Sequence, residues 1–218
     1  MNLPNALTLV RIFFIPLLVA VLVQRDIALH LGGIAITNEL LALGIFLAAA
    51  GTDMLDGYLA RRWGQITTVG TLLDPIADKL LISSALISLV QVRIVPAWMT
   101  IVIVGREFAI SGLRSIAAAE GYVIQASDLG KTKLVTQVFA ITLLILSIGS
   151  PELRPVAMAA LWVVVFFSVL SAVSYFRKFW RKIDDSVKRR RRTEFLMQQE
   201  SEATPPNPAS SSAPIVPR

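Results

Sequence analysis

The stretch Ile12–Val23 reads IFFIPLLVAVLV and carries no charged or hydroxyl side chain. Two other long runs, Leu80–Val90 and Val156–Val173, are apolar apart from a few serines. A helix on the surface of a soluble protein would repeat polar residues with a period of 3.6, whereas these runs are apolar all round. We therefore interpret them as membrane-spanning helices, and a chain of 218 residues has room for about six of them.

The predicted fold is all-α, a polytopic membrane protein with six transmembrane helices. Each predicted span is long enough to cross the bilayer. The spans are residues 6–24, 37–61, 71–92, 95–119, 130–149 and 153–176. Lys and Arg gather in loops 62–70 and 120–133 and in the tail, whereas the opposite connections hold only Arg25, Arg93 and Arg154. Because positive charge marks the cytoplasmic side, both termini are expected to be cytoplasmic. The connection 25–36 is predicted to be a loop.

The net charge of +6 belongs mainly to the tail, since ten Lys/Arg and five Asp/Glu follow position 176. Basic residues directly after a last span are typical of topology and of contact with anionic lipid, so we expect no nucleic-acid partner. We predict a catalytic membrane domain over 1–176, a basic interfacial segment over 177–200, and a disordered tail over 201–218, which is rich in Ser, Pro and Ala.

Four acidic residues interrupt the second and third predicted spans. Asp53 and Asp56 are three residues apart, and Asp74 and Asp78 are four residues apart, so each pair shares one helix face. The short loop between the two spans makes them antiparallel neighbours. An ionised carboxylate in hydrocarbon is costly and needs a partner. The spacing therefore predicts four carboxylates that converge between two facing helices.

Four clustered carboxylates without cations would repel one another. Two divalent cations, Mg²⁺ or Mn²⁺, would resolve this, because both metals prefer oxygen ligands. Two such ions can clamp the oxygens of a phosphoryl group during its transfer. The alternative is a cation transporter, whose intramembrane acids relay protons or bind Na⁺.

Small residues and one arginine accompany the acids and favour a phosphoryl-transfer enzyme over a cation transporter. Gly57 follows Asp56, Ala60 lies one turn later, and Gly70 lies one turn before Asp74. Small side chains let a planar group approach the backbone, although they also serve helix packing. Arg61 shares the face of Asp53 and can pair with a diphosphate, although it can also simply set the topology.

These eight positions, from Asp53 to Asp78, resemble the full signature of the CDP-alcohol phosphatidyltransferase family. Three further segments resemble the bacterial phosphatidylglycerophosphate synthases within that family: Asn2–Arg11, Gly105–Arg114 and Gly130–Gln137. The resemblance covers about residues 2–176. It implies an enzyme of the cell (inner) membrane whose active site faces the cytoplasm. It also implies a homodimer, because members of this family are commonly homodimers.

The resemblance also implies a role for each position of the motif. Asp53, Asp56 and Asp74 would bind the first metal, and Asp53, Asp74 and Asp78 would share the second. Asp78 would also be the general base for the attacking hydroxyl. The CDP-lipid, CDP-diacylglycerol, would be bound by Gly57, Ala60, Arg61 and Gly70, with further nucleotide contacts from Thr67, Asn5 and Thr8.

Basic residues near the expected cytoplasmic ends of the fourth and fifth spans point to the acceptor. Such side chains can hold a phosphate, although topology and snorkelling also explain them. These residues are Arg106, Arg114, Lys131 and Lys133, with Glu107 as the expected ion-pair partner of Arg106 or Lys133. The resemblance implies sn-glycerol 3-phosphate as acceptor. Inositol phosphate, serine and phosphatidylglycerol are the alternatives that the acidic motif cannot separate.

Overall fold

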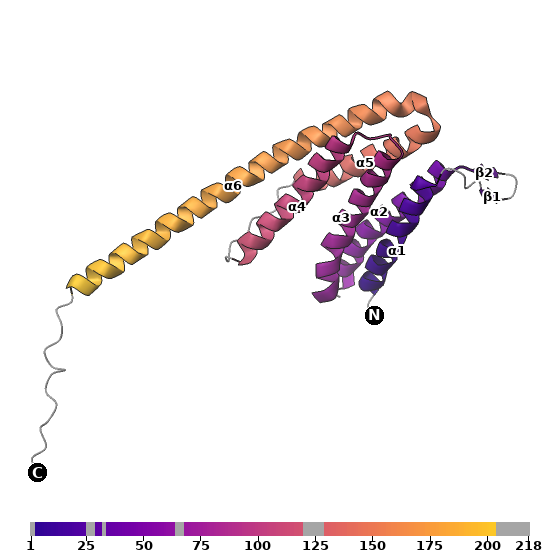
Figure 1. The fold of residues 1–218 in the computed structure, drawn as a ribbon. Coiled ribbons are helices and arrows are strands. Elements are labelled where there is room, and N and C mark those ends of the chain that lie inside the picture. The colour runs from indigo at the N-terminus through magenta and orange to yellow at the C-terminus, as the bar shows by residue number, and fades with distance from the viewer. Residues whose placement is uncertain (1–2, 25–28, 32–33, 64–67, 120–128, 204–218) are drawn as a thin grey trace, which may run out of the picture. The chain divides into compact units, whose positions relative to one another are not determined.

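In the computed structural model, the chain is predominantly α-helical (Figure 1). The structure describes the backbone of residues 3–24, 29–31, 34–63, 68–119 and 129–203, and fewer side chains: 6–24, 37–52, 75–119, 134–177, 179–181 and 196. The helices in chain order are α1 Leu3–Val23, α2 Asn38–Trp63, α3 Thr68–Gln91, α4 Ala97–Ala119, α5 Leu129–Gly149 and α6 Arg154–Ala203. A 3₁₀ turn, η1 Pro151–Leu153, precedes α6.

The six described helices follow the six predicted spans. Except for the far end of α6, no helix end differs by more than three residues from the prediction. Helix α6 runs without a break from Arg154 to Ala203, past the predicted end of the sixth span near position 176 and through the predicted interfacial segment 177–200. Its second half is rich in Lys, Arg and Glu, which are good helix formers, so no local signal ends the helix there. The predicted disordered tail from position 204 onward lies outside the described residues.

The prediction of a loop between the first two spans was wrong in part. It contains a short antiparallel pair of strands, β1 Leu29–Leu31 and β2 Ile34–Ile36, with Leu29 opposite Ile36. Two short apolar segments separated by Gly-Gly are a recognised hairpin signal in sequence. The all-α prediction therefore holds for the helices and needs this hairpin as a correction.

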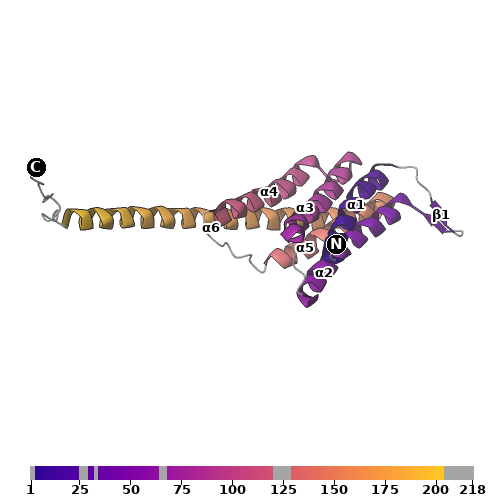
Figure 2. The same cartoon turned by 90° about the horizontal axis from the view of Figure 1, so that it is seen from below.

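The chain divides into two compact units, Met1–Val173 and Ser174–Arg218. Within the first unit, α1 packs against both α2 and α3, and α5 packs against the same two helices. Figures 1 and 2 show α1, α2 and α3 side by side in two views. In the second unit, Phe176 and Trp180 stack with ring centroids 5.6 Å apart.

The described side chains of the bundle place apolar groups outward and several polar groups inward. Large apolar residues such as Phe13 and Ile101 are each 69% exposed. The buried polar or charged residues lie on inner faces of the helices: Thr8, Arg11, Ser83, Ser88, Thr100, Arg106, Gln137, Ser147 and Ser168. This pattern is expected where lipid surrounds the bundle, because charged groups in a bilayer turn to the interior.

Two stretches of the described chain are long and apolar enough to cross a membrane, Ala6–Val23 and Pro151–Arg181. Two shorter helical stretches, Asn38–Thr52 and Leu134–Gly149, are also apolar. Together with the outward apolar surface, they indicate a membrane protein.

The turn after α3 is closed by backbone hydrogen bonds. Arg93 adopts φ 61°, and its amide donates to the Val90 carbonyl at 2.9 Å, while the Ile94 amide donates to the Leu89 carbonyl at 2.9 Å. A residue in the left-handed region after a helix is a common helix stop, usually a glycine. The Arg154 guanidinium at the start of α6 donates to the Arg93 carbonyl at 3.1 Å.

Candidate active site

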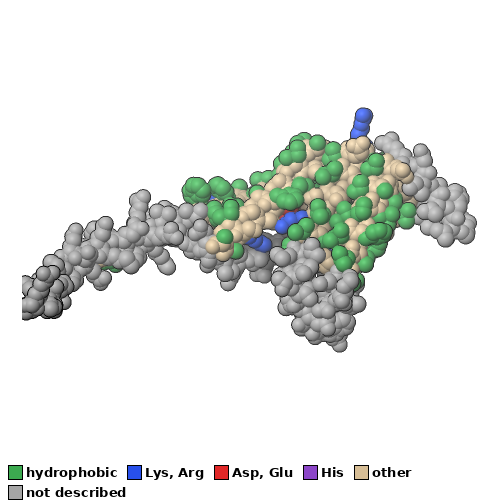
Figure 3. Space-filling view, turned by 60° about the horizontal axis from the view of Figure 1, so that its bottom comes forward, with side chains coloured by type: hydrophobic (Ala, Val, Ile, Leu, Met, Phe, Trp, Pro, Cys, Tyr) green, Lys and Arg blue, Asp and Glu red, His purple; other side chains and the backbone are tan. Residues whose placement is uncertain are grey.

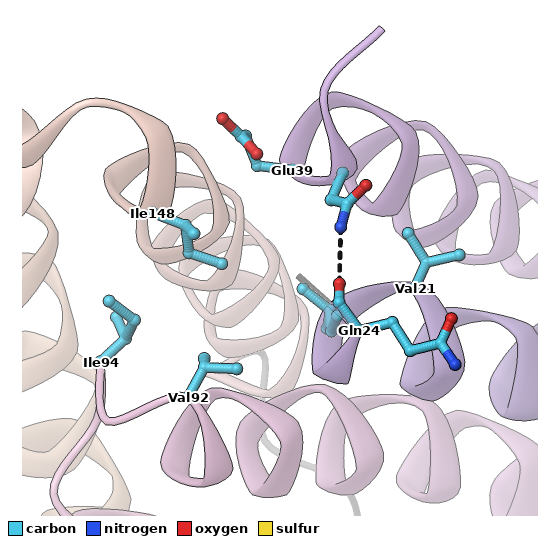
Figure 4. A pocket seen from close by; sticks show the side chains of 8 residues that line it. Val21, Gln24, Glu39, Val92, Ile94 and Ile148 are labelled. Atoms are coloured by element: carbon cyan, nitrogen blue, oxygen red, sulfur yellow. Dashed lines mark hydrogen bonds between the residues drawn. The ribbon is translucent and has the colours of Figure 1, made fainter. Parts of the chain in front are cut away.

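One end of the helical bundle is marked by a pocket of about 370 Å³ (Figure 4). It is lined by residues where α1, α3 and α5 end and α2 begins: Val21, Leu22, Gln24, Asn38, Glu39, Val92, Ile94 and Ile148. The Asn38 side-chain amide donates to the Gln24 carbonyl across it. Since four helix ends meet here, we call this the pocket end and the opposite end of the bundle the motif end.

The four aspartates of the motif lie toward the motif end of α2 and α3. Counted from Asn38 at 1.5 Å per residue, Asp53 and Asp56 lie about 23 and 27 Å along α2. Counted back from Gln91, Asp78 and Asp74 lie about 20 and 26 Å along α3. The two helices contact each other, so their backbones bring the four positions to similar levels on neighbouring helices.

Of these four side chains, that of Asp78 is described. It is half-buried and lies one turn from Leu81 and Ile82, which are buried in the core, so it occupies the inner face of α3. The side chains of Asp53, Asp56, Asp74, Ala60 and Arg61 are not among those described. The surroundings of Gly57 and Gly70 and the whole of Thr67 also lie outside the described part of the chain. For that reason no group of three candidate metal ligands occurs among the described side chains. An all-oxygen donor set on two adjoining helices is chemically suited to Mg²⁺ or Mn²⁺.

Helix α1 contributes two buried polar residues facing the helices that carry the acids. Thr8 is 1% exposed and Arg11 is fully buried, and both continue the inner stripe of Leu18 and Leu22. Arg11 lies about 18 Å from the pocket end and Thr8 about 23 Å, close to the levels of Asp78 and Asp53. The side chain of Asn5, the other predicted contact on α1, lies outside the described residues.

Arg11 received no role from the sequence, whereas Thr8 did. The signal was present, because an arginine at the edge of an apolar run is costly unless it faces the interior. The same reasoning had singled out Arg106 on the fourth span. Helix α1 packs on α2 and α3, so Arg11 belongs beside the acidic helices.

Arg106 on α4 is buried and forms one of the two ion pairs that the sequence allowed for Glu107. Its Nη2 donates to Oε1 of Glu107 at 3.0 Å. The Ser111 hydroxyl donates to the Glu107 carbonyl at 2.8 Å, and Arg114, two turns beyond Arg106, is exposed. Figure 3 shows basic side chains set in a recess among hydrophobic and backbone atoms on the face that it presents.

Helix α5 carries the two lysines of the predicted acceptor site. Lys133 and Lys131 lie about 24 and 27 Å from the pocket end, level with the aspartates, but their side chains lie outside the described residues. One turn closer to the pocket end, Gln137 is 3% exposed. Gln137 received no role from the sequence.

An acidic motif on two packed helices of a membrane bundle, with basic residues level with it, defines a membrane phosphotransferase. The chain belongs to the CDP-alcohol phosphatidyltransferase family, whose profile matches residues 1–170.

Individual relatives cover most of the chain. A CDP-diacylglycerol–glycerol-3-phosphate 3-phosphatidyltransferase of Bacillus subtilis (strain 168) is 46% identical over 190 residues, which is 85% of this chain and 98% of the relative. The protein of that name in Rickettsia felis is 36% identical over 81% of this chain and 94% of its own length. A probable phosphatidylglycerophosphate synthase of Mycobacterium tuberculosis is 37% identical over 84% and 83%.

Proposed function

We propose that this protein transfers the phosphatidyl group of CDP-diacylglycerol to sn-glycerol 3-phosphate, which yields phosphatidylglycerophosphate and CMP. The observation that carries the proposal is the complete acidic motif, from Asp53 to Asp78, on two helices that pack against each other. The relatives bearing the name of this reaction, matched over four fifths or more of the chain, support the choice of acceptor.

The aspartates would hold two divalent cations, Mg²⁺ or Mn²⁺. Asp53, Asp56 and Asp74 would bind one, and Asp53, Asp74 and Asp78 would bind the other. Two cations held there would supply positive charge to balance the negative charge of the diphosphate. This ligand set is supported by its spacing on α2 and α3 and by the preference of these metals for carboxylate oxygen.

Asp78 acts as the general base. It accepts the proton of the acceptor's free terminal hydroxyl, and the resulting oxygen attacks the phosphorus that bears the diacylglycerol. A new P–O ester bond forms while the P–O bond of the anhydride breaks, and the electron pair leaves with CMP. A carboxylate is a weak base, so its position matters more than its strength. The inner-face position of Asp78 on α3 supports this role.

The nucleotide and diphosphate occupy the motif end. Gly57, Ala60 and Gly70 leave space for the cytidine, and Arg61 pairs with the diphosphate, because a guanidinium binds phosphate oxygens in a fork. Thr8, Asn5 and Thr67 make further nucleotide contacts. Thr8 is the one whose side chain is described, and its burial on the face of α1 toward α2 and α3 supports its place.

The acceptor's phosphate lies between α4 and α5 at the motif end. Arg114, Lys131 and Lys133 supply the positive charge, each about 24–27 Å along its helix from the pocket end. Arg106 lies deeper, about 14 Å into α4, and its bond to Glu107 holds the guanidinium in a fixed orientation. These groups are positively charged and a phosphate monoester is negatively charged, so they attract it.

The bundle crosses the cell membrane six times, with both termini and the motif end on the cytoplasmic side. This arrangement is supported by the distribution of Lys and Arg between the two sets of loops. It gives water-soluble glycerol 3-phosphate access to the site while the acyl chains stay in the bilayer.

The test is release of CMP by the purified protein in detergent with CDP-diacylglycerol, Mg²⁺ and one acceptor at a time. Glycerol 3-phosphate should support turnover, and inositol phosphate, serine and phosphatidylglycerol should not. Asp53→Asn serves as the matched inactive control. Turnover with another acceptor and none with glycerol 3-phosphate would overturn the proposed acceptor, and absence of CMP release with all four would overturn the chemistry.

A further inference from the structure

The side-chain amide of Gln137 is a buried hydrogen-bonding group that the proposed reaction has not yet used. The residue is 3% exposed, and its Nε2 has no hydrogen-bond partner among the described residues. Leaving a buried amide N–H unsatisfied destabilises a protein, so nearly all such groups have a partner. A group retained in this state is suited to a ligand that supplies the missing bond.

Gln137 points into the bundle rather than toward lipid. It begins the inner stripe of α5, which continues through the buried residues Ala140, Ile141 and Leu144. This face of α5 meets α2 and α3, the helices of the acidic motif. The amide therefore lies on the side of α5 where the reaction is proposed to occur.

The level of Gln137 matches that of the proposed base. Gln137 lies about 18 Å from the pocket end along α5, and Asp78 lies about 20 Å from it along α3. Lys133, proposed to hold the acceptor's phosphate, lies one turn nearer the motif end, about 6 Å away along the axis. A glycerol 3-phosphate molecule bound at Lys133 by its phosphate thus extends its two hydroxyls toward the level shared by Asp78 and Gln137.

We propose that Gln137 hydrogen-bonds the secondary hydroxyl of the acceptor and thereby selects a glycerol phosphate over phosphates lacking that hydroxyl. An amide carries both donor and acceptor atoms, which matches a hydroxyl group that also does both. The terminal hydroxyl is engaged by Asp78, which leaves the adjacent secondary hydroxyl for Gln137. This role makes Gln137 a specificity-determining residue, and it rests on the proposed acceptor.

Two acceptors and one conservative variant test the role. Wild-type protein is assayed for CMP release with glycerol 3-phosphate and with 3-hydroxypropyl phosphate, which lacks only the secondary hydroxyl. A site built to bind a hydroxyl discriminates strongly, so kcat/KM should favour glycerol 3-phosphate by about 100-fold or more. Gln137→Met keeps the length of the side chain but removes the amide, and it should lower this ratio by about tenfold or more.

The large decrease in kcat/KM should occur with glycerol 3-phosphate only. Gln137→Met should reduce kcat/KM for glycerol 3-phosphate by roughly 30-fold and for 3-hydroxypropyl phosphate by less than about 3-fold. Thr100→Val is the matched control, because Thr100 is also buried, at 6% exposed, and its hydroxyl has no partner among the described residues, but it lies near the pocket end. That variant should leave the ratio unchanged.

Equal losses with both acceptors, or an unchanged ratio, would overturn the role of Gln137. An equal change of the ratio in Thr100→Val would overturn it as well. If Gln137→Met does not fold, Gln137→Asn withdraws the amide by one methylene and should lower the ratio in the same direction. A wild-type protein that is inactive with glycerol 3-phosphate would instead overturn the proposed function, so the two failures are distinguishable.

Discussion

Replacement of Arg11 by methionine tests whether the acidic helices depend on a buried positive charge. Arg11 is fully buried on the inner face of α1, which packs against α2 and α3. Its backbone lies about 18 Å from the pocket end, within about 5 Å of the levels of Asp53 and Asp78. Arg11→Met removes the charge but retains an apolar side chain of similar length.

The size of the effect follows from the burial. Removing one partner of a buried charge pair destabilises a protein by about 3–5 kcal/mol, because the other charge is left uncompensated. For a chain of this size, 1 kcal/mol lowers Tm by about 2–4 °C, so the loss corresponds to roughly 6–20 °C. Divalent cations bound at the aspartates would supply positive charge, so Mg²⁺ should restore part of this loss.

The measurement is thermal unfolding in detergent, with EDTA and with saturating Mg²⁺, followed by tryptophan fluorescence. Trp98 and Trp162, whose rings are 5.4 Å apart, report separation of α4 from the start of α6. The matched control is Arg154→Met, since Arg154 is exposed and donates one hydrogen bond to the Arg93 carbonyl. An exposed hydrogen bond of this kind contributes about 1 kcal/mol or less.

Two results would refute this reasoning. If Arg11→Met lowers Tm in EDTA by no more than Arg154→Met does, then the buried guanidinium does not balance the charge of the aspartates. If the loss is large but identical with and without Mg²⁺, then Arg11 acts through packing rather than charge. Arg11→Lys retains the charge and should keep most of the stability.

Four further predictions concern the site and the fold. Asp78→Asn should lower kcat for CMP release by about 100- to 10,000-fold, the usual contribution of a general base, and full turnover would exclude that role. Arg114→Ala should raise KM for glycerol 3-phosphate by about tenfold and leave KM for CDP-diacylglycerol nearly unchanged, because a charge-assisted bond to phosphate is lost; equal rises would contradict a phosphate contact. Arg93→Gly should raise the free energy of unfolding by about 0.5–1 kcal/mol in a thermal or denaturant titration, since φ 61° suits glycine. The chain has no cysteine, so Arg93→Cys should react with an impermeant thiol reagent in intact cells and Ala119→Cys should react after permeabilisation; the reverse pattern would invert the proposed topology.

The helices were predictable because their signals are local. A long apolar run such as Ile12–Val23 satisfies its backbone only as a helix inside a membrane, whatever it packs against. The ion pair between Arg106 and Glu107 was also foreseen, since a buried arginine needs a close partner. Two features lie outside the apolar runs, where weaker turn and propensity signals decide: the hairpin from Leu29 to Ile36, which corrects the predicted loop, and the continuation of α6 beyond position 176.

The burial pattern across each helix could not be read from the chain. Ile12–Val23 is apolar all round and has no preferred face, yet Phe13 is 69% exposed while Leu18 is fully buried. Only the packing of α1 on α2 and α3 makes that choice, because lipid and protein interior are equally apolar surroundings for a leucine.

The same distinction applies to the site. The spacing of the aspartates along the chain identifies the motif, since positions three and four residues apart share a helix face in any fold. Arg11 and Gln137 stand 126 positions apart in sequence, and only the tertiary structure places both on inner faces near the level of Asp78. Their burial depends on which helices meet, and that is decided by contacts between distant segments rather than by local sequence.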